Sequence, residues 1–324
     1  MRILHRIALP LLAACLSTAL HAQDKFPEHP LTLVVPYPAG GAADVIARAL
    51  ATELGKRLGQ AVIIDNRAGA NGNIGSAWVA RQQAADGYTL LLGSTSTLAI
   101  NPHLYKSMGY DPIKDLQPLS LTHKMANVLV VGASTPYKTV TDVVNAAKSQ
   151  PGSLAFGSAG NGNTMHLAGV LFQEKSDTRL VHVPYKGGPP ALNDVLAGQI
   201  PMMFNNLPAV VSVHHAGKVR ALAIADTQRS PLLPQTPTMA EAGLPGVVSV
   251  VWNGLLVRRG TPAPVVERLN TSLRAILASP EFRKPIEAQG YEVLSSTSDE
   301  FEALIKQDWA AMAVTIPQAD IRLD

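Results

Sequence analysis

The sequence predicts an α/β fold of two lobes with mainly parallel central sheets, joined by a hinge that the chain crosses twice. The chain has 324 residues, 47% of them hydrophobic, which is enough to bury two domains of ordinary size. Short apolar runs alternate with stretches that carry apolar residues at helical spacing, the pattern of βαβ units. The 25 glycines and 24 prolines are spread along the chain, as in a loop-rich globular protein.

The expected first lobe begins with a regular alternation of strands and helices. The stretch 45–58 has apolar residues at helical spacing, with Arg48 and Glu53 on the other side. The expected elements are strands at 31–35, 61–65 and 88–92, with helices at 45–58 and 74–83.

A second series follows and ends in helices alone. It comprises strands at 127–131, 154–157, 179–183, 200–204, 219–225 and 249–256, and helices at 140–149, 165–175, 190–198, 263–277, 280–289 and 298–315. Only a short strand at 292–294 interrupts the final helices, so we expect them to pack on the first lobe. The chain then crosses near 119–125 and returns near 225–237, which gives lobe 1 as 23–121 plus 226–324 and lobe 2 as 122–225.

The first 22 residues have the pattern of a secretory signal peptide. Arg2 and Arg6 precede an apolar run, and small residues follow, with expected cleavage after Ala22. The run is too short to span a bilayer comfortably. The alternative is a lipoprotein box with Cys15 as the lipidated residue; the apolar run continues past Cys15, which favours ordinary cleavage and release into the periplasm.

Composition excludes several classes of function. Cys15 is the single cysteine, so a chain without its leader has no disulfide, thiol nucleophile or thiolate metal site. Loss of Arg2 and Arg6 leaves 25 basic (27 minus 2) against 24 acidic residues, and a net charge of +1 gives no electrostatic case for binding nucleic acid or an anionic membrane.

Two segments, one in each expected lobe, share a design suited to an anion. In 34–44 and in 156–166 a strand ends, a glycine-containing loop turns, and a helix starts with backbone N–H groups that have no partner in the helix. Ordinary tight turns use glycine in the same way; one such turn in each lobe favours a shared cleft. The candidate ligand contacts are Tyr37, Ala39, Gly40 and Gly41 in the first segment, and Ser158, Ala159, Gly160 and Thr164 in the second.

Further polar residues that follow predicted strands are candidates for the same cleft. They are Ser94 and Thr95, then Tyr185, then Asn205. Each of them could instead belong to a solvated turn. Trp252 is expected in the core rather than beside a ligand.

The patterns of catalytic and cofactor sites do not occur. Ser158 has Phe156 where a G-x-S-x-G elbow needs its first glycine, and Met165 replaces the third glycine of a dinucleotide fingerprint. His214 and His215 are adjacent and cannot form a metal pair one helical turn apart. We therefore expect a binding protein rather than an enzyme, with no metal or cofactor; a secreted hydrolase and a nicotinamide site are the less favoured alternatives.

The motifs together resemble the Bug solute-binding proteins of tripartite tricarboxylate transporters, and the likeness runs in order over nearly all of the mature chain. The matching segments are 36–44, 65–75, 85–91, 183–188, 197–199 and 237–243. The resemblance implies a type II periplasmic-binding fold that closes on a small carboxylate. It also implies that the loops 37–41 and 158–160 grip that carboxylate, largely through backbone donors and water.

Two positions depart from the family pattern. Asn205 stands where many relatives carry an aspartate, and Trp252-Asn253 where an aromatic pair is common. A neutral amide offers no counter-charge to an ammonium group, so an amino acid is not the expected ligand. We expect a monomer that delivers its carboxylate to a membrane transporter; the alternative partner is the ectodomain of a sensor kinase.

Overall fold

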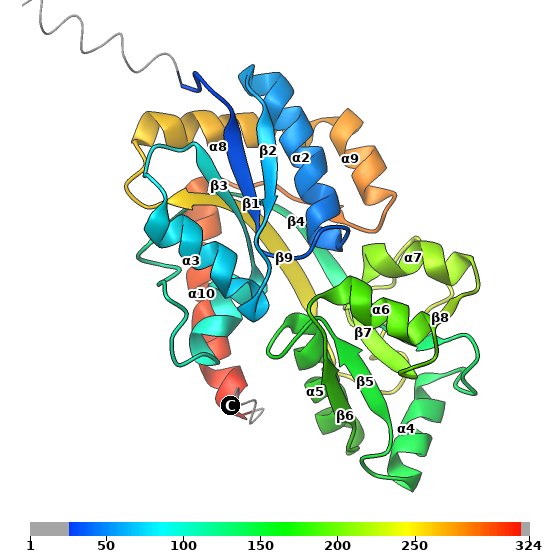
Figure 1. Ribbon diagram of the computed structural model, residues 1–324. Coiled ribbons are helices and arrows are strands. Elements are labelled where there is room, and N and C mark those ends of the chain that lie inside the picture. Colours follow the sequence, from blue (N-terminus) through cyan, green and yellow to red (C-terminus); the bar gives the residue numbers. More distant parts are fainter. Residues whose placement is uncertain (1–25, 319–324) are drawn as a thin grey trace, which may run out of the picture.

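The computed structural model describes residues 26–318. Two bodies of sheet and helix are linked by the long strands β4 and β9 (Figure 1). The expected signal peptide, its cleavage after Ala22 and the lipoprotein alternative at Cys15 lie outside the described residues. Within them, no helix is both long and apolar enough to cross a membrane.

The strands form one sheet in the order β2-β1-β3-β9-β4-β7-β5-β6, and β8 and β10 also pair with β4. The strand β1 pairs in parallel with β2 and β3, and β5 pairs in parallel with β6 and β7, whereas every pairing of β4 and β9 is antiparallel. The bounds are β1 Leu31–Val35, β2 Val62–Asn66, β3 Thr89–Ser94, β4 Leu116–Gly132, β5 Ala155–Ser158, β6 Val181–Pro184, β7 Met202–Asn206, β8 Val219–Ile224, β9 Val250–Arg258 and β10 Glu292–Val293. The α/β class expected from the sequence is confirmed.

Lobe 1 is a three-layer body around β1, β2, β3 and β9. Successive residues of a strand face opposite sides of the sheet, so Leu33 and Val34 enter different cores. Leu33 packs among apolar residues of α2 (Ala42–Leu58), α8 (Ala263–Ala278) and α9 (Pro280–Glu287). Val34 packs with Val79 of α3 (Asn73–Gln82) and Phe301 of α10 (Ser298–Gln318).

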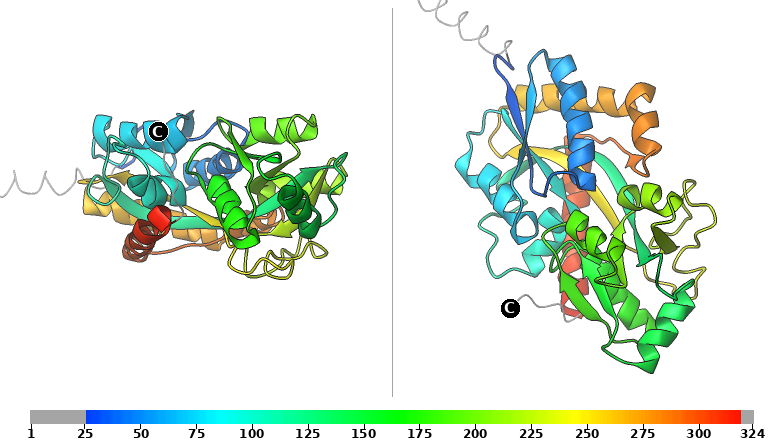
Figure 2. Two further views of the ribbon diagram at one scale, coloured as in Figure 1. Left: turned by 90° about the horizontal axis from the view of Figure 1, so that it is seen from below. Right: turned by 45° about the vertical axis from the view of Figure 1, so that its right-hand side comes forward.

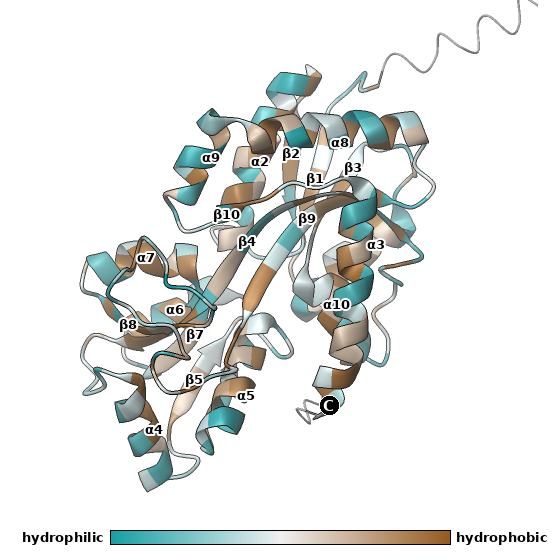
Figure 3. Cartoon of the chain, turned by 180° about the vertical axis from the view of Figure 1, so that it is seen from behind, coloured by the Kyte–Doolittle hydropathy of each residue, from teal (hydrophilic) through white to brown (hydrophobic). Residues whose placement is uncertain are grey.

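Lobe 2 has its own core around β5, β6, β7 and β8. Phe156, Phe172 and Phe204 are fully buried there. Hydrophobic residues concentrate on the strands and on the inner faces of the helices (Figure 3). The helices are α4 (Val140–Ser149), α5 (Thr164–Ser176), α6 (Gly188–Leu196) and α7 (Leu207–His215). The helix α7 was not expected from the sequence; Pro208 in its first turn favours a helix start there.

The two crossings between the lobes differ from the expected ones. The first is a single unbroken strand: β4 pairs with β9 as far as Ala126 and with β7 and β8 from Asn127 onward. The return lies at the start of β9, because residues 226–249 pack on lobe 2 through buried Leu233, Met239 and Leu244. The expected assignment of 226–249 to lobe 1 therefore differs from the packing, since these apolar residues bury in the nearer core.

Asn127 joins the two crossings. Its backbone N–H donates to Ser249 O at 2.9 Å, and its Nδ2 donates to Ser249 Oγ at 2.8 Å. Ser249 Oγ in turn donates to Thr164 O at 3.0 Å, which ties the crossing to the first residue of α5. The two lobes lie side by side across these strands (Figure 2).

Candidate functional site

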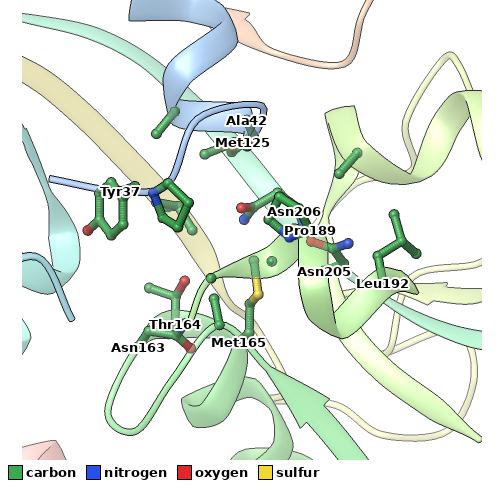
Figure 4. A pocket seen from close by; sticks show the side chains of 18 of the residues that line it. Tyr37, Ala42, Met125, Asn163, Thr164, Met165, Pro189, Leu192, Asn205 and Asn206 are labelled. Atoms are coloured by element: carbon green, nitrogen blue, oxygen red, sulfur yellow. The ribbon is translucent and has the colours of Figure 1, made fainter. Parts of the chain in front are cut away.

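A cavity of about 260 Å³ lies between the lobes. Ala42 and Met125 face it from one side and Thr164 and Met165 from another, with Tyr37 toward one end and Leu192 toward the other (Figure 4). Its lining comes from both lobes: Tyr37, Pro38, Gly40, Gly41, Ala42, Ala43, Ser94, Ser96, Met125, Ala159, Asn163, Thr164, Met165, Gly187, Gly188, Pro189, Leu192, Asn193, Asn205, Asn206, Ala209, Val251 and Asn253.

Four helices begin at this cavity. The N-cap residues of α2, α5, α6 and α7 are Gly41, Asn163, Gly187 and Asn206, and all four line it. Each helix start carries the positive end of its dipole and N–H groups without helical partners. The sequence pointed to two of these starts; the fold brings four to one place.

The starts of α2 and α5 offer unpartnered donors. The backbone N–H groups of Gly41, Ala42 and Ala43, and those of Thr164 and Met165, donate to no acceptor within residues 26–318. All five residues line the cavity. An anion between the two helix starts can therefore receive hydrogen bonds from both lobes.

No lysine, arginine, histidine, aspartate or glutamate belongs to the lining. Tyr37 is the one titratable residue there, and burial raises its pKa to about 12, so it stays neutral. Its hydroxyl lies 2.6 Å from Ser94 Oγ. An anion bound here would be stabilised by amide groups and helix dipoles, not by a charged side chain of the lining.

A buried carboxylate holds the loop of lobe 1 in place. Asp44 accepts hydrogen bonds from Gly40 N at 2.9 Å, from Arg48 Nε at 2.9 Å and from Asn66 Nδ2 at 2.9 Å. Burial opposes ionisation, but the bonds from Arg48, Gly40 and Asn66 outweigh it, and the pKa of Asp44 is lowered. The loop is thus anchored by a charge inside a network of donors.

Neutral imidazoles support the loop of lobe 2. The rings of His166 and His182 stack with centroids 3.8 Å apart, and His182 Nε2 lies 2.6 Å from Ser158 Oγ. Gly162 N donates to His166 Nδ1 at 3.0 Å, and Gly160 N donates to Ser158 Oγ at 3.1 Å. Burial lowers the pKa of His166 to about 4 and that of His182 to about 3.

The residues chosen from the sequence divide into two groups. Seven line the cavity: Tyr37, Gly40, Gly41, Ser94, Ala159, Thr164 and Asn205. Five do not: Ala39, Thr95, Ser158, Gly160 and Tyr185.

Each of those five has another position or partner. Ala39 is exposed. Thr95 Oγ1 accepts from Trp252 N at 3.0 Å, and Tyr185 donates to Asp194 Oδ2 at 2.6 Å. Ser158 and Gly160 bond to each other and shape the loop behind the cavity.

Several lining residues escaped the sequence reasoning. Met125 and Val251 come from the two crossing strands, whose placement needs the tertiary fold. Leu192 and Ala209 are apolar residues of α6 and α7, and no polar pattern marks them as ligand contacts in the sequence. Two amides that the sequence already placed at strands also line the cavity: Asn206 follows the strand predicted at 200–204, beside Asn205, and Asn253 lies within the strand predicted at 249–256.

The serine–histidine contact does not make a hydrolytic site. Ser158 is fully buried and lies outside the lining, so a substrate in the cavity does not reach its hydroxyl. No carboxylate within residues 26–318 accepts a hydrogen bond from His182. Over the same residues no group of three or more His, Cys, Asp or Glu is arranged to hold a metal ion.

Comparison with known proteins gives a consistent result. Residues 46–320 match the model of the family described as the tripartite tricarboxylate transporter family receptor. Protein BugT of Bordetella pertussis is 37% identical over 293 residues, which cover 89% of this chain and 90% of BugT.

Two solved structures are similar over the whole fold. An R. palustris protein solved with adipate is 35% identical, with a TM-score of 0.89 over 92% of this chain and 99% of that one. The protein MatC from Rhodopseudomonas palustris, solved with bound malate, is 31% identical, with a TM-score of 0.84 over 89% of this chain and 99% of that one.

Proposed function

The chain belongs to the family of tripartite tricarboxylate transporter receptors, and from that premise we propose that it captures a small carboxylate between its lobes and delivers it to a membrane transporter. The observation that carries the proposal is the meeting of unpartnered N–H groups from Ala42 and Ala43 of lobe 1 with those of Thr164 and Met165 of lobe 2. Adipate and malate in the related structures support the ligand class.

The mechanism is ligand-dependent closure rather than turnover. The lobes rotate about β4 and the start of β9, and only the closed form brings both helix starts to one anion. A ligand that contacts both lobes stabilises that form by its differential affinity. We propose that the closed form is then recognised by a membrane transporter. A transporter is favoured over a sensor kinase as the partner because the matching family is described as a transporter receptor family.

The same proposal includes the cellular location and the oligomeric state of the protein. The segment 1–22 directs export, and the mature protein works in the periplasm as a monomer. Light scattering of the purified mature protein, with and without ligand, gives the oligomeric state.

The variant Ala42→Pro tests the anion site. Proline is tolerated at the first position of a helix; it removes the N–H there and puts its Cδ methylene in place of the hydrogen. A proline restricts the residue before it to extended backbone. Gly41, which precedes position 42, already has φ −79° and ψ 167°, so it meets this restriction. Loss of one hydrogen bond to a charged group costs about 1.5–3 kcal/mol, so we expect the Kd for the bound carboxylate to rise about 10- to 100-fold.

The matched control is Ala263→Pro, at the first position of α8. Ala263 is exposed, and the change removes one N–H from a helix start that does not line the cavity. A thermal-shift screen of carboxylates first identifies the ligand by the rise in melting temperature that it causes. Titration calorimetry then gives the Kd of that ligand for each variant. Equal affinity in both variants, or a fold-intact protein to which no carboxylate binds, would contradict the proposal.

A further inference from the structure

We propose that Tyr291 is a positioning residue of the anion site, whose hydroxyl fixes and polarises the first peptide group of α2 from outside the cavity. Tyr291 Oη donates to Ala42 O at 2.8 Å, although the two residues lie 249 positions apart in the sequence. Tyr291 does not line the cavity, so it acts on a ligand only through α2. The inference rests on the proposed function, because it takes for granted that a carboxylate binds at the start of that helix.

The peptide group between Ala42 and Ala43 connects the tyrosine to the cavity. Its carbonyl oxygen accepts from Tyr291, and its N–H, which belongs to Ala43, is one of the unpartnered donors at the cavity. A hydrogen bond to a carbonyl draws electron density toward the oxygen, which makes the N–H of the same peptide group a stronger donor. The hydroxyl, the peptide group and a bound carboxylate therefore form one cooperative chain of hydrogen bonds.

The start of α2 needs restraint because it follows two glycines, Gly40 and Gly41, whose backbone is conformationally permissive. Asp44 accepts from Gly40 N at 2.9 Å, and Tyr291 donates to the carbonyl of Ala42, two residues further on. These two bonds fix the loop and the first helical turn from different parts of the chain. Donors that already have their bound orientation lose less conformational freedom when the ligand arrives.

Packing between the lobes fixes the ring of Tyr291. The residue is 4% exposed, and its ring meets that of His123 of β4 edge to face, with ring centroids 5.4 Å apart. Gly290 has φ +100°, and a Cβ there would lie 3.1 Å from Leu207 Cγ at the start of α7 in lobe 2. Burial raises the pKa of Tyr291 above its ordinary value, so the hydroxyl keeps its proton and remains a donor.

Tyr110 has the same structural role without the connection to the cavity. It is 6% exposed in lobe 1, and its hydroxyl donates to Thr97 O at 2.6 Å. Neither Tyr110 nor Thr97 lines the cavity. Both tyrosines thus satisfy a backbone carbonyl, but only Tyr291 does so at a peptide group that presents its N–H to the ligand. Tyr110→Phe is therefore the matched control for Tyr291→Phe.

The first test measures carboxylate affinity by titration calorimetry. Acetate, malate, adipate and benzoate are the probes, and the tightest of them is used for every variant. We expect Tyr291→Phe to raise its Kd about fivefold and Tyr110→Phe to leave it within about twofold. An unchanged Kd in Tyr291→Phe, or an equal rise in both variants, would overturn the inference while the proposed function stands. Binding of none of the probes to the unmodified chain would contradict the proposed function itself.

A double-variant experiment tests the route through the N–H of Ala43. Ala43→Pro removes that N–H within the first helical turn, where α6 itself carries Pro189 and Pro190. We expect Tyr291→Phe to raise the Kd by less than about twofold in this background, but still about fivefold in the Ala42→Pro background, which keeps the N–H of Ala43. A fivefold rise in both backgrounds would show that Tyr291 acts by another route.

Nuclear magnetic resonance gives a readout that needs no ligand. The amide nitrogen of Ala43 belongs to the peptide group that accepts from Tyr291, so its resonance responds to the loss of that bond. We expect this resonance to shift in Tyr291→Phe and to stay in place in Tyr110→Phe. A resonance that stays in place in both variants would overturn the proposed polarisation. Thermal melts of every variant show that the fold is retained.

Discussion

Two loops present backbone amide groups to the cavity, and each is held in place by a different kind of side chain. The loop of lobe 1 is held by ionised Asp44, which gathers donors from Gly40, Arg48 and Asn66. The loop of lobe 2 is held by the neutral, stacked pair His166 and His182. A positive helix start can thus be fixed either by a nearby charge or without one, and the two solutions respond differently to mutation and to pH.

The largest effect is expected from Asp44→Ala, which breaks the support of lobe 1. It removes the acceptor of Gly40 N and leaves the partners of a buried carboxylate unpaired. We expect the free energy of unfolding to fall by about 3 kcal/mol, and carboxylate affinity to fall with it. Urea denaturation measures the change.

The control for Asp44→Ala is Glu53→Ala, which breaks an exposed ion pair with Lys56 on the same helix. That change should cost less than about 0.5 kcal/mol. Equal costs for the two variants would show that the Asp44 network does not hold the loop.

Acid should loosen the loop of lobe 2 before the loop of lobe 1. Burial depresses the pKa of His166 and His182 below the unfolded value, so below pH 6.5 the unfolded chain binds more protons and stability falls toward the folded pKa values of about 4 and 3. Asp44 has a lowered pKa, so its contribution persists until the pH falls below the ordinary pKa of an aspartate in the unfolded chain. We expect a loss of about 2 kcal/mol between pH 6.5 and pH 4.5, measured by denaturation at each pH.

Two variants separate the source of this pH dependence. The double variant His166→Phe/His182→Phe keeps aromatic rings but cannot be protonated, and it should make the curve clearly shallower over that range; buried His123, whose pKa burial lowers to about 3, keeps the remaining slope. His215→Gln, at an exposed histidine, should leave the curve unchanged. A curve that keeps its slope in the double variant would place the effect elsewhere, for example at buried His123.

The smallest effects compare a glycine from each loop. Gly160 has φ +131°, and a Cβ there would lie 3.3 Å from Tyr185 O, whereas Gly40 has φ +78° and open space around a Cβ. We expect Gly160→Ala to cost about 2 kcal/mol of stability and Gly40→Ala about 1 kcal/mol. Thermal denaturation measures the loss of stability in each variant. A larger loss for Gly40→Ala than for Gly160→Ala would show that the loop of lobe 2 is not the more constrained of the two.

Local pattern was enough to predict much of this molecule. The segments 34–44 and 156–166 were identified because the end of a strand, a glycine loop and a helix start follow one another within about ten residues. The same logic predicted Tyr37, Gly41 and Thr164, which the fold brings to the cavity. Ser158, which the same logic selected, lies outside the lining, and its hydroxyl contacts His182 Nε2 at 2.6 Å.

Local pattern was insufficient where partners are distant in sequence. The strand β4 was expected only from residue 127, because Leu116–Ala126 becomes a strand by pairing with β9, more than a hundred residues later. The helix α7 was missed because it is short and mostly apolar, so its sequence does not show the alternation of a polar and an apolar face that marks a helix. Residues 226–249 were assigned to lobe 1, whereas their buried residues Leu233, Met239 and Leu244 pack in the core of lobe 2.

By itself, the sequence determined the α/β class and the two glycine turns, because hydrophobic period and turn chemistry act over a few residues. Only the tertiary structure decided that four helix starts meet at one cavity, and that the cavity has no charged wall. Those properties depend on which strands lie next to each other in the sheet, and that order is set by burial and pairing across the whole chain.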